Sequence, residues 1–231
     1  MKKLAILTAT LMIFSSCKEH VDKSNLSHHE QHPGCKHEEE LGKVRDTFNL
    51  KLISLYNSNL PVAKLISKSD SLIKDFKESN SDLHTDIAFL CEAQINYFNA
   101  EMLYKNGYYQ KSINELHKSN PFGNSTGDIA AGIAANYIKL EEFDKAKIFV
   151  DSIGKGYYLY EYALANYYET IKAKNEAVKI YKNIIDRKSH QERFYYKSSA
   201  LRLEELEREN PTFLHEIIFP TRKPRDETFK K

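Results

Sequence analysis

Apolar positions in the middle of the chain recur with helical spacing, and the unit that carries them is itself repeated. A small residue stands at Ala100, Ala134 and Ala165, at intervals of 34 and 31 residues. A second small residue follows twelve positions after each, and large residues keep fixed offsets from both. These further positions are Ser112, Ala146 and Ala177, then Leu103, Tyr137 and Tyr168, then Leu116, Val150 and Tyr181. Such a period in helix-forming sequence predicts helix pairs that stack on their neighbours in a solenoid.

The small residues have a physical role in this prediction. Two helices approach closely only where one of them offers a small side chain, so we expect Ala100 and Ser112 to face one another. One pair cannot bury its apolar face alone, and about three or more repeats are needed for stability. A compact, irregular helical bundle with accidental periodicity is the alternative.

The repeated segments resemble the tetratricopeptide repeat over residues 87–185. Residues 100–113 are similar to the family's first helix, its turn, here at Gly107, and the start of its second helix. The third segment departs from the family pattern at Lys174, where an aromatic residue is usual. The resemblance implies an all-α fold, a right-handed α-solenoid of antiparallel helix pairs.

The same resemblance implies a binding surface. In that family the first helices of the pairs line a concave groove, which takes a protein or peptide partner. The matching positions of this chain are Tyr97, Glu101, Tyr104, Ile138, Tyr162 and Asn166. Tyrosine suits such a surface because it joins a large apolar ring to a polar tip. Alternatively, several of these tyrosines simply pack between repeats.

Further helices are predicted on either side of the repeats. Residues 43–58 carry an apolar stripe at helical spacing, and residues 82–106 form a long helix for which Gly107 is a suitable C-cap. A helix over residues 190–209 and a short closing helix over residues 212–219 complete the prediction.

The N-terminus has the features of a secretory signal. Lys2 and Lys3 precede a short apolar run, and Ser15 and Ser16 precede Cys17. The run is too short to cross a bilayer as a helix, which needs about 20 residues. Its ending resembles the bacterial lipobox, which implies a signal peptide over residues 1–16 and a lipid on Cys17. An ordinary signal peptide with an incidental cysteine is the alternative.

A lipid on Cys17 would fix the location of the chain. Two or three acyl chains give a stable anchor, whereas one would be marginal. The next residue, Lys18, is not the aspartate that retains many such proteins at the inner membrane, so we expect an outer-membrane anchor in the bacterial cell envelope. The leaflet, periplasmic or surface-facing, stays open.

The domain prediction follows from these observations. Residues 17–40 are polar and lack periodic apolar positions, so they are predicted to form a flexible tether. Residues 41–219 form the helical repeat domain. Residues 220–231 form a basic C-terminal tail, which we expect to be solvated.

The tether contains a cluster of residues that can bind metals: His28, His29, His32, Cys35 and His37. Histidine and cysteine are good ligands for zinc and copper. The spacing matches no specific zinc module, and short His-rich tracts are compositional hints. A metal-capturing lipoprotein is therefore the alternative hypothesis for function, beside a polar tether in which histidine is merely tolerated.

Charge and motifs narrow the function. Removal of residues 1–16 takes away Lys2 and Lys3 and no acid, which leaves 32 basic and 32 acidic residues. A protein that binds nucleic acid would show an excess of basic residues, so we do not expect this chain to bind nucleic acid. The sequence contains no phosphate loop, dinucleotide fingerprint or nucleophile elbow, and we predict no enzyme and no catalytic residues. The expected function is a lipid-anchored scaffold for protein–protein interaction.

Overall fold

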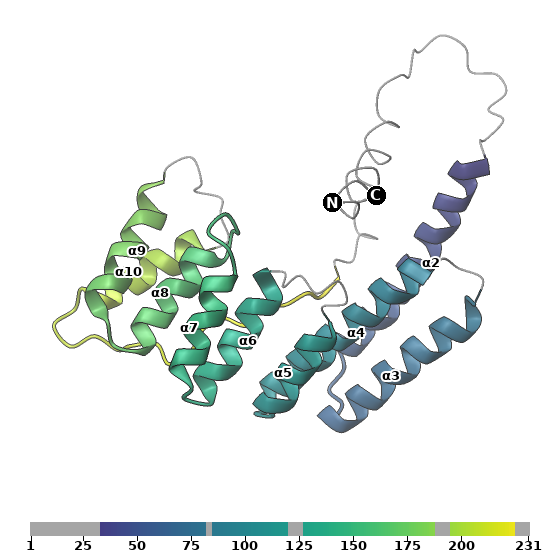
Figure 1. Cartoon of the computed structure of the whole chain (residues 1–231), viewed down its shortest axis with the longest axis horizontal. Helices are drawn as coiled ribbons and strands as arrows, with labels where there is room; N and C mark the ends of the chain where they lie inside the picture. Colours follow the sequence, from purple (N-terminus) through teal and green to yellow (C-terminus); the bar gives the residue numbers. More distant parts are fainter. Residues whose placement is uncertain (1–32, 82–84, 120–126, 188–194, 225–231) are drawn as a thin grey trace, which may run out of the picture. The chain divides into compact units, whose positions relative to one another are not determined.

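The computed structural model describes residues 33–81, 85–119, 127–187 and 195–224 of the chain. Regular secondary structure in these ranges is entirely α-helical (Figure 1), which confirms the all-α prediction. The chain divides into two units, residues 1–40 and 41–231. The second unit contains most of the first described helix and every later one.

The described helices are α2 (Pro33–Tyr56), α3 (Val62–Ser79), α4 (Thr85–Lys105), α5 (Tyr109–Lys118), α6 (Gly127–Lys139), α7 (Phe143–Ser152), α8 (Tyr160–Thr170), α9 (Lys174–Asp186) and α10 (Tyr196–Leu206). Among the described residues, two boundaries differ from the prediction by three residues or more. Helix α2 begins well before residue 43, inside the predicted tether, and α10 ends three residues before the predicted end at residue 209. The predicted start of that helix, at residue 190, lies outside the described residues.

Helices that are adjacent in sequence pack against one another. From α3 to α10, each helix contacts the next along the chain. The most extensive contacts join α4 with α5, α6 with α7 and α8 with α9, which are the three predicted pairs. Packing between sequence neighbours is consistent with a helical repeat.

The helix boundaries repeat the spacing of the sequence. The first helices of the three pairs end at Lys105, Lys139 and Thr170, again at intervals of 34 and 31 residues. The second helices begin at Tyr109, Phe143 and Lys174, with the same intervals. The third pair therefore keeps its register although Lys174 replaces an aromatic residue.

Each first helix ends in the same pair of backbone hydrogen bonds. In the first pair, the Gly107 amide donates to the Tyr104 carbonyl at 3.0 Å, and the Tyr108 amide donates to the Leu103 carbonyl at 2.9 Å. This arrangement is a Schellman motif, which satisfies carbonyls left over at a helix end.

The Schellman motif requires a left-handed backbone at one residue, and the three pairs provide it differently. Gly107 has a φ of 79°, and the equivalent Glu141 and Lys172 both have a φ of 60°. Side chains other than glycine are disfavoured in this region because Cβ crowds the following carbonyl oxygen. Only the first pair therefore has the residue that the turn favours, and Gly107 confirms the predicted C-cap.

The small residues of the repeat lie where helices approach closely. Ala100 and Ser112 are both fully buried, and the Ser112 hydroxyl donates to the Ala100 carbonyl at 2.8 Å. The Asn136 amide, from the next pair, donates to the Ser112 hydroxyl at 3.0 Å. The predicted contact between Ala100 and Ser112 is therefore confirmed. The other four small residues are also fully buried: Ala134, Ala146, Ala165 and Ala177.

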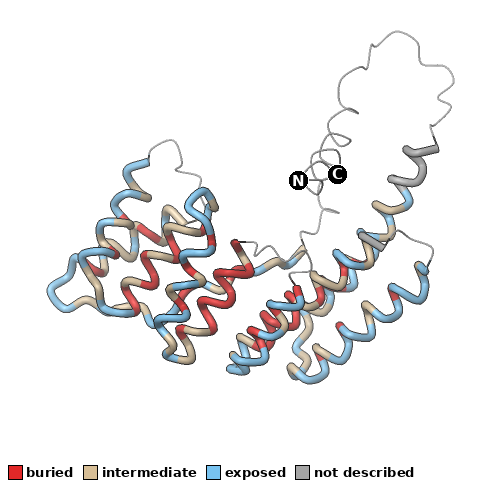
Figure 2. The backbone as a smooth tube through the Cα atoms, viewed as in Figure 1, coloured by how far each residue is buried: buried red, intermediate tan, exposed pale blue. Residues whose placement is uncertain are grey.

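Burial differs between the repeats and the helices that precede them (Figure 2). Most of α6 is buried, whereas α3 buries only Leu65, Ser69 and Phe76 among its described residues. Helices α2 and α3 pack on α4 through a smaller core, whose largest fully buried members are Phe48, Leu52, Ile95 and Phe98.

The C-terminal part of the domain is not helical. Residues 211–224, which we call the C-terminal strap, have no regular secondary structure, so the predicted helix over residues 212–219 is wrong. The backbone groups of the strap bind side chains of the helices instead of one another: Arg202 donates to the Thr212 carbonyl and Leu214 donates to Glu169. In Figure 1 the strap, drawn in yellow, leads from the end of α10 back past α8 and α6.

Candidate functional site

The residues predicted to line a groove all lie on the first helices of the pairs, α4, α6 and α8. We call the side of these helices that meets the strap the first-helix face. Five of the six predicted residues are at most 8% exposed, and the sixth, Tyr104, is half-buried. The strap contacts Tyr97, Glu101 and Tyr104.

An aromatic cluster on α4 holds the middle of the strap. The Phe219 ring stacks on Tyr104 with ring centroids 4.7 Å apart, and it tilts against Tyr97 at 6.0 Å. The Tyr97 hydroxyl donates to the Pro220 carbonyl at 2.7 Å. A methyl group at Gly132 of α6 would come within 3.3 Å of the Phe219 ring, so this glycine leaves the ring room. Burial raises the pKa of Tyr97 and of Tyr104.

Three carboxylates, one from each first helix, bind the strap or the side chains beside it. The first is Glu101 of α4, which is 2% exposed. It accepts hydrogen bonds from the Tyr56 hydroxyl at 3.0 Å and from the Thr221 hydroxyl at 3.1 Å. Lys105 pairs with it at 2.7 Å. Glu101 therefore bonds the strap to the end of α2.

The second carboxylate is Asp128, in the first turn of α6. It accepts hydrogen bonds from the hydroxyls of Tyr157 and Tyr158 at 2.7 and 3.0 Å. The Arg222 side chain of the strap donates to it at 3.1 Å. The same guanidinium lies over the Tyr97 ring, 4.5 Å from its centroid. Arg222 is therefore held both by a charge and by an aromatic face.

The third carboxylate is Glu169 of α8, which is fully buried. It accepts a hydrogen bond from the Tyr181 hydroxyl at 3.0 Å and one from the Leu214 amide of the strap at 2.7 Å. The Arg202 guanidinium of α10 binds both of its oxygens. A buried carboxylate is stable only when it is paired and hydrogen-bonded in this way.

The tyrosines beside these carboxylates remain protonated donors at ordinary pH. Burial raises the pKa of Tyr56, Tyr157 and Tyr181. The carboxylate that each one contacts raises it further, because a phenolate would repel the carboxylate.

The other three predicted residues, Tyr162, Asn166 and Ile138, contact Tyr195, Tyr181 and the core. The Tyr162 ring stacks on Tyr195 with centroids 4.5 Å apart, and burial raises the pKa of Tyr195 to about 12. The Asn166 amide donates to the Tyr181 hydroxyl at 2.8 Å. Ile138 belongs to the same core cluster as Ile217, a residue of the strap that is completely buried.

Contacts also fix the two ends of the strap. The Thr212 amide donates to Glu205 at 3.0 Å, and this hydrogen bond lowers the pKa of Glu205. At the other end, the Lys223 ammonium donates to the Asn57 side chain at 2.6 Å. The first residues of the predicted basic tail are therefore bound to the domain, while residues 225–231 lie outside the described part.

Sequence analysis missed Asp128, Glu169 and the strap itself. The signal for Glu169 was present: it stands four positions after Ala165, in the register of Tyr104 and Ile138, so an acid was predictable on the first-helix face. Nothing comparable marked Asp128, because its partners come from distant parts of the chain.

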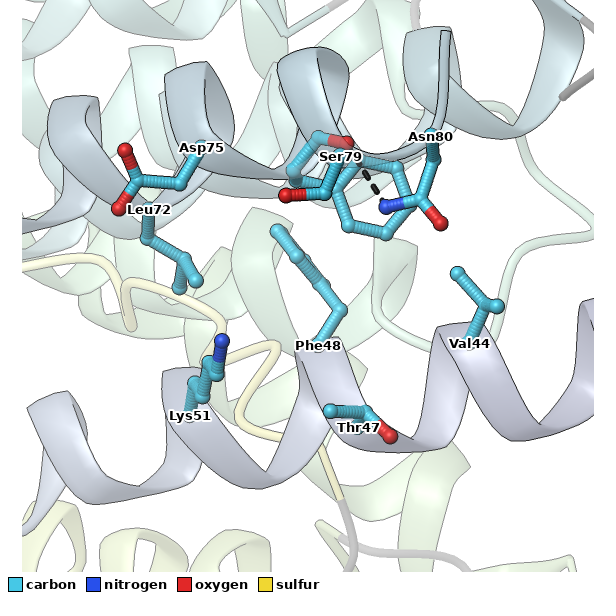
Figure 3. A pocket seen from close by; sticks show the side chains of 9 residues that line it. Val44, Thr47, Phe48, Lys51, Leu72, Asp75, Ser79 and Asn80 are labelled. Atoms are coloured by element: carbon cyan, nitrogen blue, oxygen red, sulfur yellow. Dashed lines mark hydrogen bonds between the residues drawn. The ribbon is translucent and has the colours of Figure 1, made fainter. Parts of the chain in front are cut away.

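A separate cleft of about 240 Å³ lies between α2 and α3 (Figure 3). The rings of Phe48 and Phe76 meet edge-on within it, with centroids 5.1 Å apart. Among the described residues that line it, only Lys51 and Asp75 are ionisable. The cleft therefore has fewer carboxylates to offer than the first-helix face.

The predicted lipid and metal sites cannot be placed on this fold. Cys17, His28, His29 and His32 lie outside the described residues, and α2 contains Cys35 and His37 without their side chains being described. Within the described ranges, no group of three or more histidine, cysteine, aspartate or glutamate side chains is arranged to hold a metal ion. None of the described helices is long and apolar enough to cross a membrane.

The described contacts define what the first-helix face can do. It offers three carboxylate acceptors and a tyrosine-rich surface to an extended peptide, and it binds amide, hydroxyl and guanidinium groups. Comparisons with protein-family models, with characterised proteins and with solved structures find no match.

Proposed function

We propose that this chain is a lipid-anchored scaffold of the bacterial cell envelope whose first-helix face binds an extended segment of a partner protein. The helices from α4 to α9 form a right-handed solenoid of tetratricopeptide-like pairs. The anchor is a lipid on Cys17 at the outer membrane, and the partner is a protein or peptide of the envelope.

The regular register of the three pairs supports the solenoid. Helix ends, Schellman turns and buried small residues all recur at intervals of 34 and 31 residues. Units that repeat one geometry and contact only their neighbours build extended surfaces that suit the binding of other molecules.

The single observation that carries the binding function is the strap. It lies against α4, α6 and α8 without secondary structure of its own, held by side chains that point at its backbone and at its polar groups. This face therefore has the size and chemistry for an extended peptide, and a partner segment can use the same contacts.

Site-specific cross-linking in intact cells tests this function. A photo-reactive residue at Lys105, beside Glu101, is expected to capture one recurrent envelope protein. The same residue at Ile148, which is 66% exposed on α7 of the second pair, is the matched control and should not capture it. Equal capture at both positions, or none at Lys105, would contradict the proposal.

The anchor needs its own test, because it depends on the N-terminal sequence alone. The Cys17→Ser variant is expected to leave the membrane fraction and appear in the soluble envelope fraction. Continued partition of this variant with membranes would show that lipid on Cys17 does not hold the chain there.

A further inference from the structure

We infer that the strap occupies the position of the partner, so that the partner segment has the same chemistry in an extended conformation. That chemistry is an aromatic residue, then a residue that offers its backbone carbonyl, then a hydroxyl residue and then arginine. This inference rests on the proposed function and adds to it the class of ligand. It also makes the strap a built-in competitor that the partner must displace.

Four consecutive strap residues carry this chemistry, and each contacts the first helices. Phe219 stacks on Tyr104, and the Pro220 carbonyl accepts from Tyr97. Thr221 donates to Glu101. Phe219, Thr221 and Arg222 are contacted through their side chains, and Pro220 is contacted through its backbone carbonyl. The face therefore selects side chains at three of these four positions.

Arginine is the most specific member of this sequence. Arg222 donates from its Nε to Asp128 at 3.1 Å while its planar guanidinium covers the Tyr97 ring. A lysine ammonium lacks the planar group that stacks in this way, so it replaces arginine poorly at such a site. The face should therefore prefer arginine to lysine.

The strap is held by contacts that a second peptide could take over. Among the described residues, no backbone–backbone hydrogen bond joins it to the helices. Its burial varies along the chain: Ile217 and Pro220 are buried, Ile218 is exposed, and Phe219 is partly covered. A segment that is anchored through side chains, with no backbone hydrogen bonds to the helices, opens more readily than a core helix.

Attachment to the same chain makes the strap an effective competitor. A covalently linked segment acts at a local concentration in the millimolar range. A free peptide then binds with an affinity reduced by the fraction of molecules in which the face is open. Weakening the strap should therefore strengthen the binding of a free peptide with the same sequence.

The experiment measures binding of a fluorescently labelled peptide of residues 211–224 to the full chain by anisotropy. The double variant Phe219→Ala/Arg222→Ala is expected to bind the peptide at least tenfold more tightly than the unmodified chain. Arg222→Ala alone, at a side chain that is 31% exposed, should give a smaller gain without disturbing the fold. Ile218→Ala, at the exposed neighbour, is the matched control and should bind like the unmodified chain.

Peptide variants test the sequence order. A scrambled peptide should not bind, and a peptide with lysine in place of Arg222 should bind several-fold more weakly than the original. Equal binding by the double variant and the unmodified chain would overturn the inference, as would equal binding of original and scrambled peptides. The cross-linking at Lys105 is independent of this result, so failure here leaves the proposed function to be judged by that experiment.

Discussion

The first and second helices of the pairs differ in what they bury. The second helices, α5, α7 and α9, bury little beyond small and apolar residues: Ser112, Ile113, Leu116, Ala146, Val150, Ala177 and Tyr181. The first helices bury polar and charged residues as well: Asn99, Glu101, Asn136, Asn166, Glu169 and Thr170.

This difference indicates that the second helices serve the stability of the fold, whereas the first helices also serve binding. A second helix needs only a small residue, which allows close approach, and an apolar contact to pack on its partner. A buried carboxylate is costly unless other groups satisfy it, so its presence on a first helix requires polar partners in addition to the apolar contacts between helices. The strap is one such partner, because it donates a hydrogen bond to Glu101 and to Glu169. The cations of Lys105 and Arg202 also pair with these carboxylates.

Loss of Glu169 should have the largest effect. Glu169→Ala removes the carboxylate that pairs with Arg202 and accepts from the Leu214 amide, and breaking such a pair costs about 3 kcal/mol of the free energy of unfolding. Urea denaturation checks this value. Glu176→Ala, at an exposed acid of α9, is the control and should change stability by less than about 0.5 kcal/mol. A similar loss of unfolding free energy in the two variants would contradict the proposed difference between the first and second helices.

Replacing a small buried residue of a second helix by a larger one should have the next largest effect on stability. Ala146 is fully buried on α7, and Ala146→Leu is expected to destabilise the fold by about 2 kcal/mol through overpacking. Ile148→Ala on the same helix, at a 66% exposed side chain, should be nearly neutral. A neutral Ala146→Leu variant, measured by thermal unfolding, would mean that the pair does not depend on a small residue there.

The sequence predicted the small residues at the helix contacts but not the strap. Ala100, Ala134 and Ala165 follow a local rule, because helix pairs that dock in the same way need small residues at the same register. The strap follows no such rule: Tyr97 and Pro220 bond across 123 residues, and no periodic pattern predicts that contact. The expected helix over residues 212–219 failed because tertiary contacts of Ile217 and Leu214 overrode local preference.

Alkaline pH should weaken the tyrosine–carboxylate contacts. The pKa of Tyr181 is raised in the folded state, first by burial and then by Glu169. Its contribution to stability is therefore complete below the unfolded pKa of about 10, and it is lost as pH rises from there through the folded pKa. The expected slope is about 1.4 kcal/mol per pH unit from this residue. Tyr181→Phe should reduce the slope of unfolding free energy against pH between pH 10 and 11, and an unchanged slope would contradict this role.

The smallest effect concerns the turns between first and second helices. Lys172 adopts a φ of 60° where the equivalent Gly107 has a φ of 79°. Lys172→Gly should stabilise the fold by up to about 1 kcal/mol because it removes crowding at Cβ. Gly107→Ala should destabilise it by a similar amount, and thermal unfolding of the two variants checks both signs. A destabilising Lys172→Gly would show that the third turn does not follow the geometry of the first.

The most direct test of the whole account is hydrogen exchange at the Leu214 amide in the full chain. That amide donates to buried Glu169, so it should exchange about a hundredfold more slowly than in a free peptide of the same sequence. Exchange at the free-peptide rate, while the amides of α6 and α8 stay protected, would show that the first-helix face is open and that the strap does not occupy it.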